Sequence, residues 1–154
     1  MCIRDRAEYD AIAEHMAYDN PRVAAFSQYL FKDDPVSGRL TDSSIGGFVG
    51  FQTGLEYVSG QHKPLYNGFP VPLTVTKRGH GFSLWGLVRP TAGVTKATVL
   101  VKLKGARSYR TLKTVTTNGA GYWSFNSSTK GVSWRVRWVS PAGVKYEGPP
   151  IDAY

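Results

Sequence analysis

Residues 96–104 read KATVLVKLK, and their side chains alternate between apolar and polar over most of the stretch. Successive side chains of a β-strand point to opposite faces, so the odd positions would share an apolar face and the even positions a polar one. Only Leu100 departs from this alternation. Residues 134–138, WRVRW, alternate in the same way, with two arginines on the polar face. This pattern is typical of antiparallel sheet that has one face in the core and the other in water.

From residue 71 onward, such alternating stretches follow one another to the C-terminus. Turns are indicated where glycine, asparagine or proline interrupts them, at residues 79–81, 91–93, 105–106, 118–119 and 140–143. About seven strands at this spacing predict an immunoglobulin-like or fibronectin-like β-sandwich over residues 71–154. Residues 109–112 break the alternation and predict a β-bulge.

The first seventy residues carry a different pattern. Apolar side chains at positions 9, 12, 13, 16 and 17 form the stripe of an amphipathic helix, which Pro21 would end because the residue before a proline is pushed out of the helical region. Residues 23–31 are apolar at nearly every position, which is typical of a strand covered on both faces, as in a parallel sheet. A polar loop then leads to a short helix near residues 64–66.

Helix, doubly covered strand, loop and helix make one α/β repeat over residues 7–70. One repeat cannot cover its own strand, so we expect it to be the end of a larger parallel sheet or barrel. The overall class would be α+β. The junction at residues 70–72 is short, which predicts that the sandwich packs against this unit.

The charge is divided unevenly between the two parts. Residues 1–70 hold six Lys and Arg against nine Asp and Glu, whereas residues 71–154 hold thirteen against two. A basic part could attract nucleic acid, an anionic membrane or an acidic polymer. Alternatively, the cations keep a β-rich surface solvated and its edge strands apart. Lys and Arg are spaced singly along the strands, which favours this second interpretation.

The single cysteine, Cys2, leaves no partner for an internal disulfide and no thiolate metal site. It lies in residues 1–6, MCIRDR, which resemble the translated adapter that opens many metagenomic reading frames. We therefore expect these residues not to be biological and the natural chain to begin upstream. No apolar run reaches the length of a membrane helix, so we expect no membrane span.

A set of short motifs runs along residues 8–90. They are PRV at 21–23, FSQYL at 26–30, DD at 33–34, FQTGL at 51–55, KP at 63–64, PL at 72–73 and LWGLVRP at 84–90, with Gly60, Tyr66 and Phe69 between them. In order and spacing they resemble the C-terminal end of secreted actinobacterial glycoside hydrolases of the cellulase-like (β/α)8 kind.

This resemblance implies that residues 7–70 are the last repeat of a truncated (β/α)8 barrel, with residues 23–31 as its eighth strand. The sandwich would be an accessory domain packed on that barrel. The protein would be secreted and extracellular, and its partner would be a polysaccharide or oligosaccharide. Both catalytic glutamates of the family would lie upstream of residue 8, so we expect no catalytic residue, no cofactor and no activity in this chain.

Four residues at the carboxyl end of the expected strand are candidates for substrate binding, because barrel active sites gather at that end. Gln28 or Tyr29 would contact a sugar ring, and Asp33 or Asp34 would bind its hydroxyls. The alternative is that Gln28 and Tyr29 satisfy core hydrogen bonds and the aspartates cap the loop. Adjacent carboxylates on a strand point to opposite sides, so this pair is no acid–base couple.

Trp123 is the fifth candidate. It could lie on either face of its strand, and on the outer face it would form a platform for sugar stacking. Trp134 and Trp138 alternate with arginines, which favours the core. Aromatics interleaved with arginine could also bind single-stranded nucleic acid, but no other feature supports that, and we expect no nucleic-acid partner.

Glu8 and Glu14 lie opposite the apolar stripe of the expected helix, so we expect both in solvent. The three histidines are scattered over separate elements without ligand spacing, and we expect no metal site. Two functions stay open. One is the C-terminal part of a secreted glycoside hydrolase, and the other is a non-enzymatic extracellular β-sandwich module that binds a glycan or an anionic wall polymer.

Overall fold

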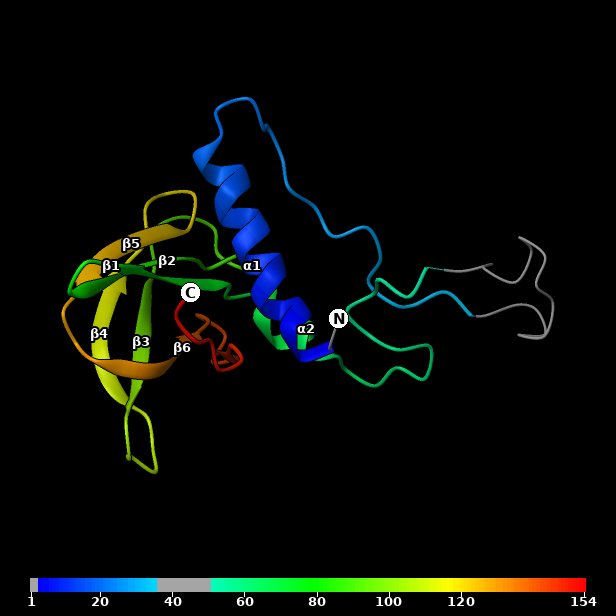
Figure 1. Cartoon of the computed structure of the whole chain (residues 1–154). Coiled ribbons are helices and arrows are strands. Elements are labelled where there is room, and N and C mark those ends of the chain that lie inside the picture. The colour runs from blue at the N-terminus through cyan, green and yellow to red at the C-terminus, as the bar shows by residue number, and fades with distance from the viewer. Residues whose placement is uncertain (1–2, 36–50) are drawn as a thin grey trace.

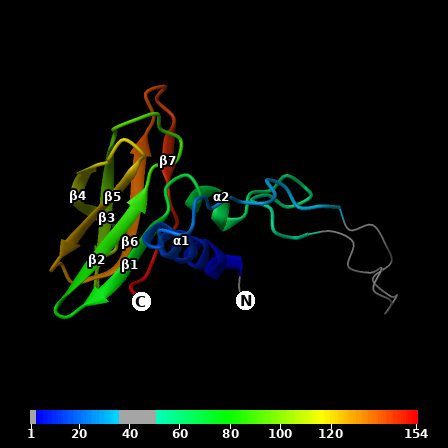
Figure 2. The ribbon, with the colours of Figure 1, turned by 90° about the horizontal axis from the view of Figure 1, so that it is seen from above.

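Figure 1 shows the computed structural model of the protein, which describes residues 3–35 and 51–154. The helices and strands of this part are α1 (Ile3–Asp19), α2 (Pro64–Gly68), β1 (Leu73–Arg78), β2 (Gly81–Leu87), β3 (Lys96–Leu103), β4 (Arg110–Thr116), β5 (Tyr122–Ser127), β6 (Gly131–Val139) and β7 (Lys145–Glu147). The residues between the two helices, which we call the arm (20–35 and 51–63), extend away from the strands (Figures 1 and 2).

Residues 71–154 form two antiparallel sheets, with strand order β1-β2-β5 in one and β4-β3-β6-β7 in the other. One cluster of buried side chains draws on both sheets. It includes Val75 and Leu84 from the first sheet and Val99 and Val136 from the second, all of them fully buried. Two sheets that share one core are a β-sandwich, so the prediction of a β-sandwich is confirmed. The predicted overall class of α+β is wrong, because most of the regular structure in the described residues is antiparallel sheet.

Two tryptophans of β6 fill the centre of this core. Trp134 and Trp138 are each 1 % exposed. Each lies two residues from Val136, on the same face of the strand, as the alternation in the sequence predicts. Burying apolar surface stabilises the folded chain by about 25 cal/mol per Å². The large rings therefore contribute much of the energy that holds the two sheets together.

Trp123 belongs to the same core, so of the two faces that the sequence leaves open it lies on the inner one and forms no exposed platform. Its side chain is 5 % exposed and its ring lies 6.0 Å from that of Phe125. Residues two apart on a strand share a face, so both rings point inward while Ser124 is exposed. On β2, the register partner of Trp123 is Gly86, where a Cβ atom would run into the indole ring.

The predicted bulge at residues 109–112 is present on β4. Val99 pairs with Lys113, but the next residue of β3, Leu100, pairs with Thr111. Leu112 is therefore the extra residue of the pair, and its side chain packs against the core. The bulge explains why the alternation of β4 fails at that point.

Residues 23–31 form no strand, and the prediction that residues 7–70 are the last repeat of a truncated (β/α)8 barrel is wrong. Most of these residues are exposed, including Tyr29 at 76 % and Phe31 at 61 %. The carbonyl of Phe31 accepts hydrogen bonds from the amides of Leu55 and Glu56, and the next residue, Lys32, forms a parallel bridge with Glu56. An apolar run becomes a covered strand only where neighbours pair with its backbone along its length, and in the described residues this pairing begins only at the end of the run.

α1 lies beside the sandwich and contacts β1 and α2 (Figure 1), but through a different face from the predicted one. Ala7, Ala11 and Glu14 are buried, whereas Tyr9 and Met16 of the predicted apolar stripe are 56 % and 69 % exposed. Small side chains at one-turn spacing let a helix approach its neighbours closely. This close approach, and not the hydrophobic stripe, decides which way α1 faces.

Candidate functional site

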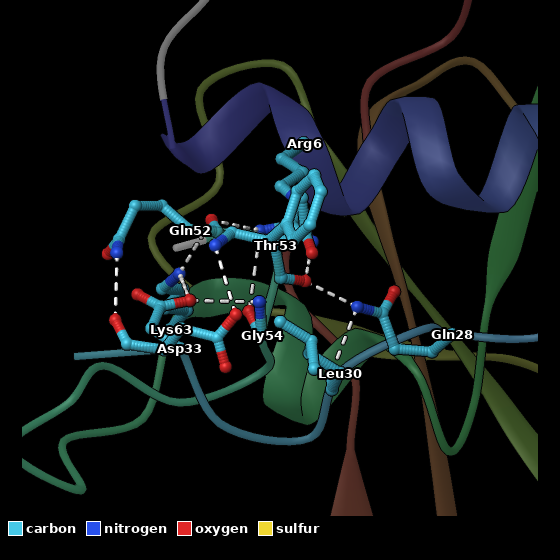
Figure 3. Close-up of polar contacts among 10 residues, drawn as sticks. Arg6, Gln28, Leu30, Asp33, Gln52, Thr53, Gly54 and Lys63 are labelled. Atoms are coloured by element: carbon cyan, nitrogen blue, oxygen red, sulfur yellow. Dashed lines mark hydrogen bonds and ion pairs between the residues drawn. The ribbon is translucent and has the colours of Figure 1, made fainter. Parts of the chain in front are cut away.

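Gln28 and Tyr29 lie on the arm, where Figure 3 shows the surroundings of Gln28. The Gln28 side-chain amide donates hydrogen bonds to the carbonyl of Leu30, at 3.1 Å, and to the carbonyl of Thr53. Tyr29 is largely exposed and its ring meets the ring of Phe51 edge-on at 5.8 Å. Gln28 thus links the two halves of the arm, and sugar contact by either residue stays a prediction.

The two aspartates also hold the arm together. Asp33 is buried, and its carboxylate accepts hydrogen bonds from the Lys63 ammonium at 2.5 Å and from the Gly54 amide at 2.9 Å (Figure 3). The carboxylate of Asp34 accepts from the Phe51 amide at 3.1 Å. These bonds agree with the alternative that the aspartates cap the loop, and hydroxyl binding by either remains a prediction.

Glu14 is not in solvent, contrary to the prediction, but is 4 % exposed and paired with Arg89. Both carboxylate oxygens accept from the guanidinium at 2.8 Å. Arg89 also donates to the carbonyl of Phe69 at 3.0 Å and lies over its ring at 3.8 Å. Because 75 residues separate Glu14 from Arg89, helical periodicity alone gave no sign of the pair.

Burial disfavours the charged form of Glu14 and raises its pKa to about 7, with Arg89 opposing this effect and the nearby Asp10 adding to it. One residue along, the His15 ring stacks on Trp85 with 4.4 Å between the ring centroids. Burial lowers the pKa of His15. Titratable groups therefore lie directly in the contact between α1 and the sandwich.

The outer face of the four-stranded sheet β4-β3-β6-β7 is strongly basic, and we call it the basic face. The alternation of β3 and β6 explains why these side chains point outward, since the neighbouring residues on each strand point into the core. The face carries five cations and one acid: Lys96, Lys102, Arg135, Arg137, Lys145 and Glu147.

The one acid of the basic face is shared by three cations. Glu147 lies 3.1 Å from Arg135, 2.9 Å from Arg137 and 3.5 Å from Lys145. Burial opposes ionisation of this carboxyl, but the hydrogen bonds from Arg137 and Arg135 outweigh that effect and hold the pKa of Glu147 below its ordinary value. The carboxylate is thus ionised at neutral pH and cancels one of the five positive charges.

Hydroxyl groups lie between the cations. Thr98 is paired in register with Thr114 on one side and with Arg137 on the other, and Arg137 is paired with Glu147. These four residues form a row across all four strands. Two more hydroxyls of β4, those of Thr111 and Thr116, lie on the same face.

The residues that the structure describes contain no group of three or more His, Cys, Asp or Glu that could hold a metal ion. Among the same residues, no helix is both long and apolar enough to cross a membrane. Comparisons of the chain with protein families, with curated proteins and with solved structures find no match.

Proposed function

We propose that this chain is a non-enzymatic β-sandwich module that binds an anionic polysaccharide on its basic face. The observation that supports this function best is the unbalanced charge of that face, which carries five cations and one carboxylate, and only three of the cations contact that carboxylate. A polymer with regularly spaced carboxylate, sulfate or phosphate groups would complete the balance.

The excess charge is available to a ligand. Lys96 and Lys102 of β3 make no ion pair with any described residue, and Lys145 is 57 % exposed beside Glu147. Exposed cations attract a polyanion over about one Debye length, roughly 8–10 Å at physiological salt. Burial of so many like charges by a protein partner would be costly, whereas a hydrated polyanion leaves them in contact with water.

The geometry of the face suits an extended chain. Side chains repeat about every 7 Å along a strand and about every 5 Å between strands, so cations and hydroxyls form a flat, regular array. The row through Thr114, Thr98 and Arg137 places hydroxyls beside a guanidinium. Hydroxyls can both donate and accept hydrogen bonds, which matches the many hydroxyls of a sugar polymer.

Nucleic acid fits this face less well. Proteins that bind single strands stack the bases on exposed aromatic rings. In the described residues of this face, the ring of Tyr109 lies under the guanidinium of Arg135 at 4.9 Å, and its hydroxyl bonds to Ser133 at 2.9 Å. The remaining positions of the face carry Thr, Ser, Lys, Arg, Glu147 and the aliphatic Leu100 and Val139, and none of these side chains offers an aromatic stacking surface.

The test is binding of the full chain to polygalacturonate and to dextran, an uncharged control, by isothermal titration calorimetry. We expect binding to polygalacturonate at about 50 mM NaCl, with affinity about tenfold or more weaker at about 500 mM, since salt screens exposed charges. Dextran should not bind the basic face. No binding to polygalacturonate, or equal binding of a poly(dT) strand, would reject the proposed ligand class.

The resemblance to secreted glycoside hydrolases supports a role on glycans and an extracellular location, and both belong to the same proposal. Catalysis does not. A module of this kind would act by holding a polymer in place.

A further inference from the structure

A pocket of about 400 Å³ lies between α1 and the sandwich, away from the basic face. Its walls come from four parts of the chain: α1, residues 23–26 of the arm, and the segments at the end of β2 and the start of β5. The volume is within the range of pockets that bind small organic molecules. We propose that this pocket binds one neutral sugar ring through its vicinal hydroxyls.

The polar wall is the pair of Glu14 and Arg89. Arg89 has five N–H groups, of which three are used, on Phe69 and on the two oxygens of Glu14. One N–H on each terminal nitrogen remains, and each carboxylate oxygen keeps a further acceptor position. The pair therefore offers donors and acceptors side by side, at the fixed spacing of a bidentate contact.

A vicinal diol matches this arrangement. One hydroxyl can donate to a Glu14 oxygen while its neighbour accepts from the Arg89 guanidinium. The two charges of the pair cancel, so this wall has no net charge that would attract an anion or a cation, whereas a neutral ligand can use its free donors and acceptors. This favours a neutral polyhydroxyl compound over an anion or a cation.

The aromatic wall is formed by Tyr18 and Tyr122, whose ring centroids lie 4.4 Å apart at an angle of 38°. Both rings also lie against Trp85, at 5.6 Å and 5.8 Å. Trp85 is buried, so the two tyrosines are held in position before any ligand arrives. Such preorganisation lowers the entropic cost of binding, and the C–H face of a sugar ring can pack on these rings.

Four of the remaining wall residues are alanines, which leaves room for a ring, and Val23 and Phe26 of the arm add apolar surface. Ala17 of α1, Ala24 and Ala25 of the arm and Ala120 before β5 line the pocket together with Leu87. The site combines a hydrogen-bonding pair, fixed aromatic rings and space. It is independent of the polyanion site, because it takes an uncharged ligand on a different surface.

The test uses the ¹⁵N-labelled full chain at pH 8, titrated with D-glucose, D-mannose, D-galactose and D-xylose and followed by amide NMR shifts. At least one sugar should shift the amides of Tyr18 and Ala120 in a saturable way, equally at low and high salt. trans-1,2-Cyclohexanediol should shift the same amides, and cyclohexanol, which lacks the diol, should not.

Tyr18→Ala should weaken the binding about tenfold or more, because it removes one aromatic wall. The matched control is Tyr9→Ala, on an exposed position of the same helix outside the pocket. Lys96→Gln/Lys102→Gln should leave sugar binding unchanged, which separates this site from the basic face. The proposal fails if no sugar shifts these amides at about 100 mM, if cyclohexanol acts like the diol, or if Tyr18→Ala and Tyr9→Ala behave alike.

Discussion

The contact of α1 with the sandwich depends on one residue of the helix, Glu14. Its carboxylate is buried and held by Arg89, so the helix, the end of α2 and the segment after β2 meet at one ion pair. Removing one partner of a buried pair leaves the other without its counter-charge, which costs more than the pair itself contributes. The pair therefore acts together with the close approach of Ala7 and Ala11 to fix which face of α1 meets the sandwich.

The raised pKa of Glu14 predicts a pH-dependent stability. The folded chain binds the proton more tightly than the unfolded chain, so this contribution is fully present below pH 4.5 and is lost as the pH rises through about 7. A pKa change from 4.5 to about 7 corresponds to about 3 kcal/mol. Glu14→Gln has no such titration, so between pH 4.5 and 8 its unfolding free energy should rise relative to the wild type by up to that amount.

Urea denaturation of both proteins across this pH range measures the difference. Asp152→Asn serves as the control, since Asp152 is an exposed carboxylate outside α1. A difference between Glu14→Gln and wild type that stays constant with pH would show that Glu14 does not titrate in this way.

At the scale of the elements, the contact between β2 and β5 depends on a glycine. Trp123 can lie flat against β2 only because Gly86 has no side chain. Gly86→Ala should destabilise the sandwich by about 2–3 kcal/mol, because the added methyl meets the indole ring and the carbonyl of Pro72. Thermal unfolding followed by calorimetry measures this change.

Gly119→Ala is the matched control for that substitution. Gly119 lies in the turn before β5, and an added Cβ there meets nothing within 4 Å. Its unfolding free energy should change by less than about 0.5 kcal/mol. Equal stability of the two alanine variants would mean that the Trp123 ring leaves room for a methyl group at Gly86.

At the scale of the whole molecule, the sandwich could be predicted because its information is local. Alternation along β3 and β6 is visible within eight or nine residues, and it assigned Trp134 and Trp138 to the core. The arm could not be predicted in this way. An unbroken apolar run such as residues 23–31 gives the same sequence pattern whether or not other strands and helices cover it. Which segments cover it depends on the whole fold and not on the run itself.

The candidate sites also differ in how much of each could be predicted from local sequence. The cations of the basic face are visible in the sequence as the polar half of the alternation, although their gathering around Glu147 is not. The pocket was missed entirely, since Glu14, Tyr18, Arg89 and Tyr122 come from distant segments. Helical periodicity predicts Glu14 in solvent, because an apolar stripe identifies apolar positions and cannot identify a buried ion pair.

At the same scale, we propose that the basic face, and not the net charge of the chain, binds an anionic polysaccharide. The most direct test compares two variants that each lose two positive charges. Lys96→Gln/Lys102→Gln removes cations from the basic face, and Lys77→Gln/Arg78→Gln removes exposed cations from β1 in the other sheet. The measurement is the affinity of each for polygalacturonate at about 50 mM NaCl.

We expect the first variant to bind about tenfold more weakly than the wild type, since two charge contacts contribute about 1–2 kcal/mol together. The second variant should bind within about twofold of the wild type, because its cations lie on the other sheet. Equal losses in the two variants would mean that net charge alone attracts the polymer, and would contradict the claim.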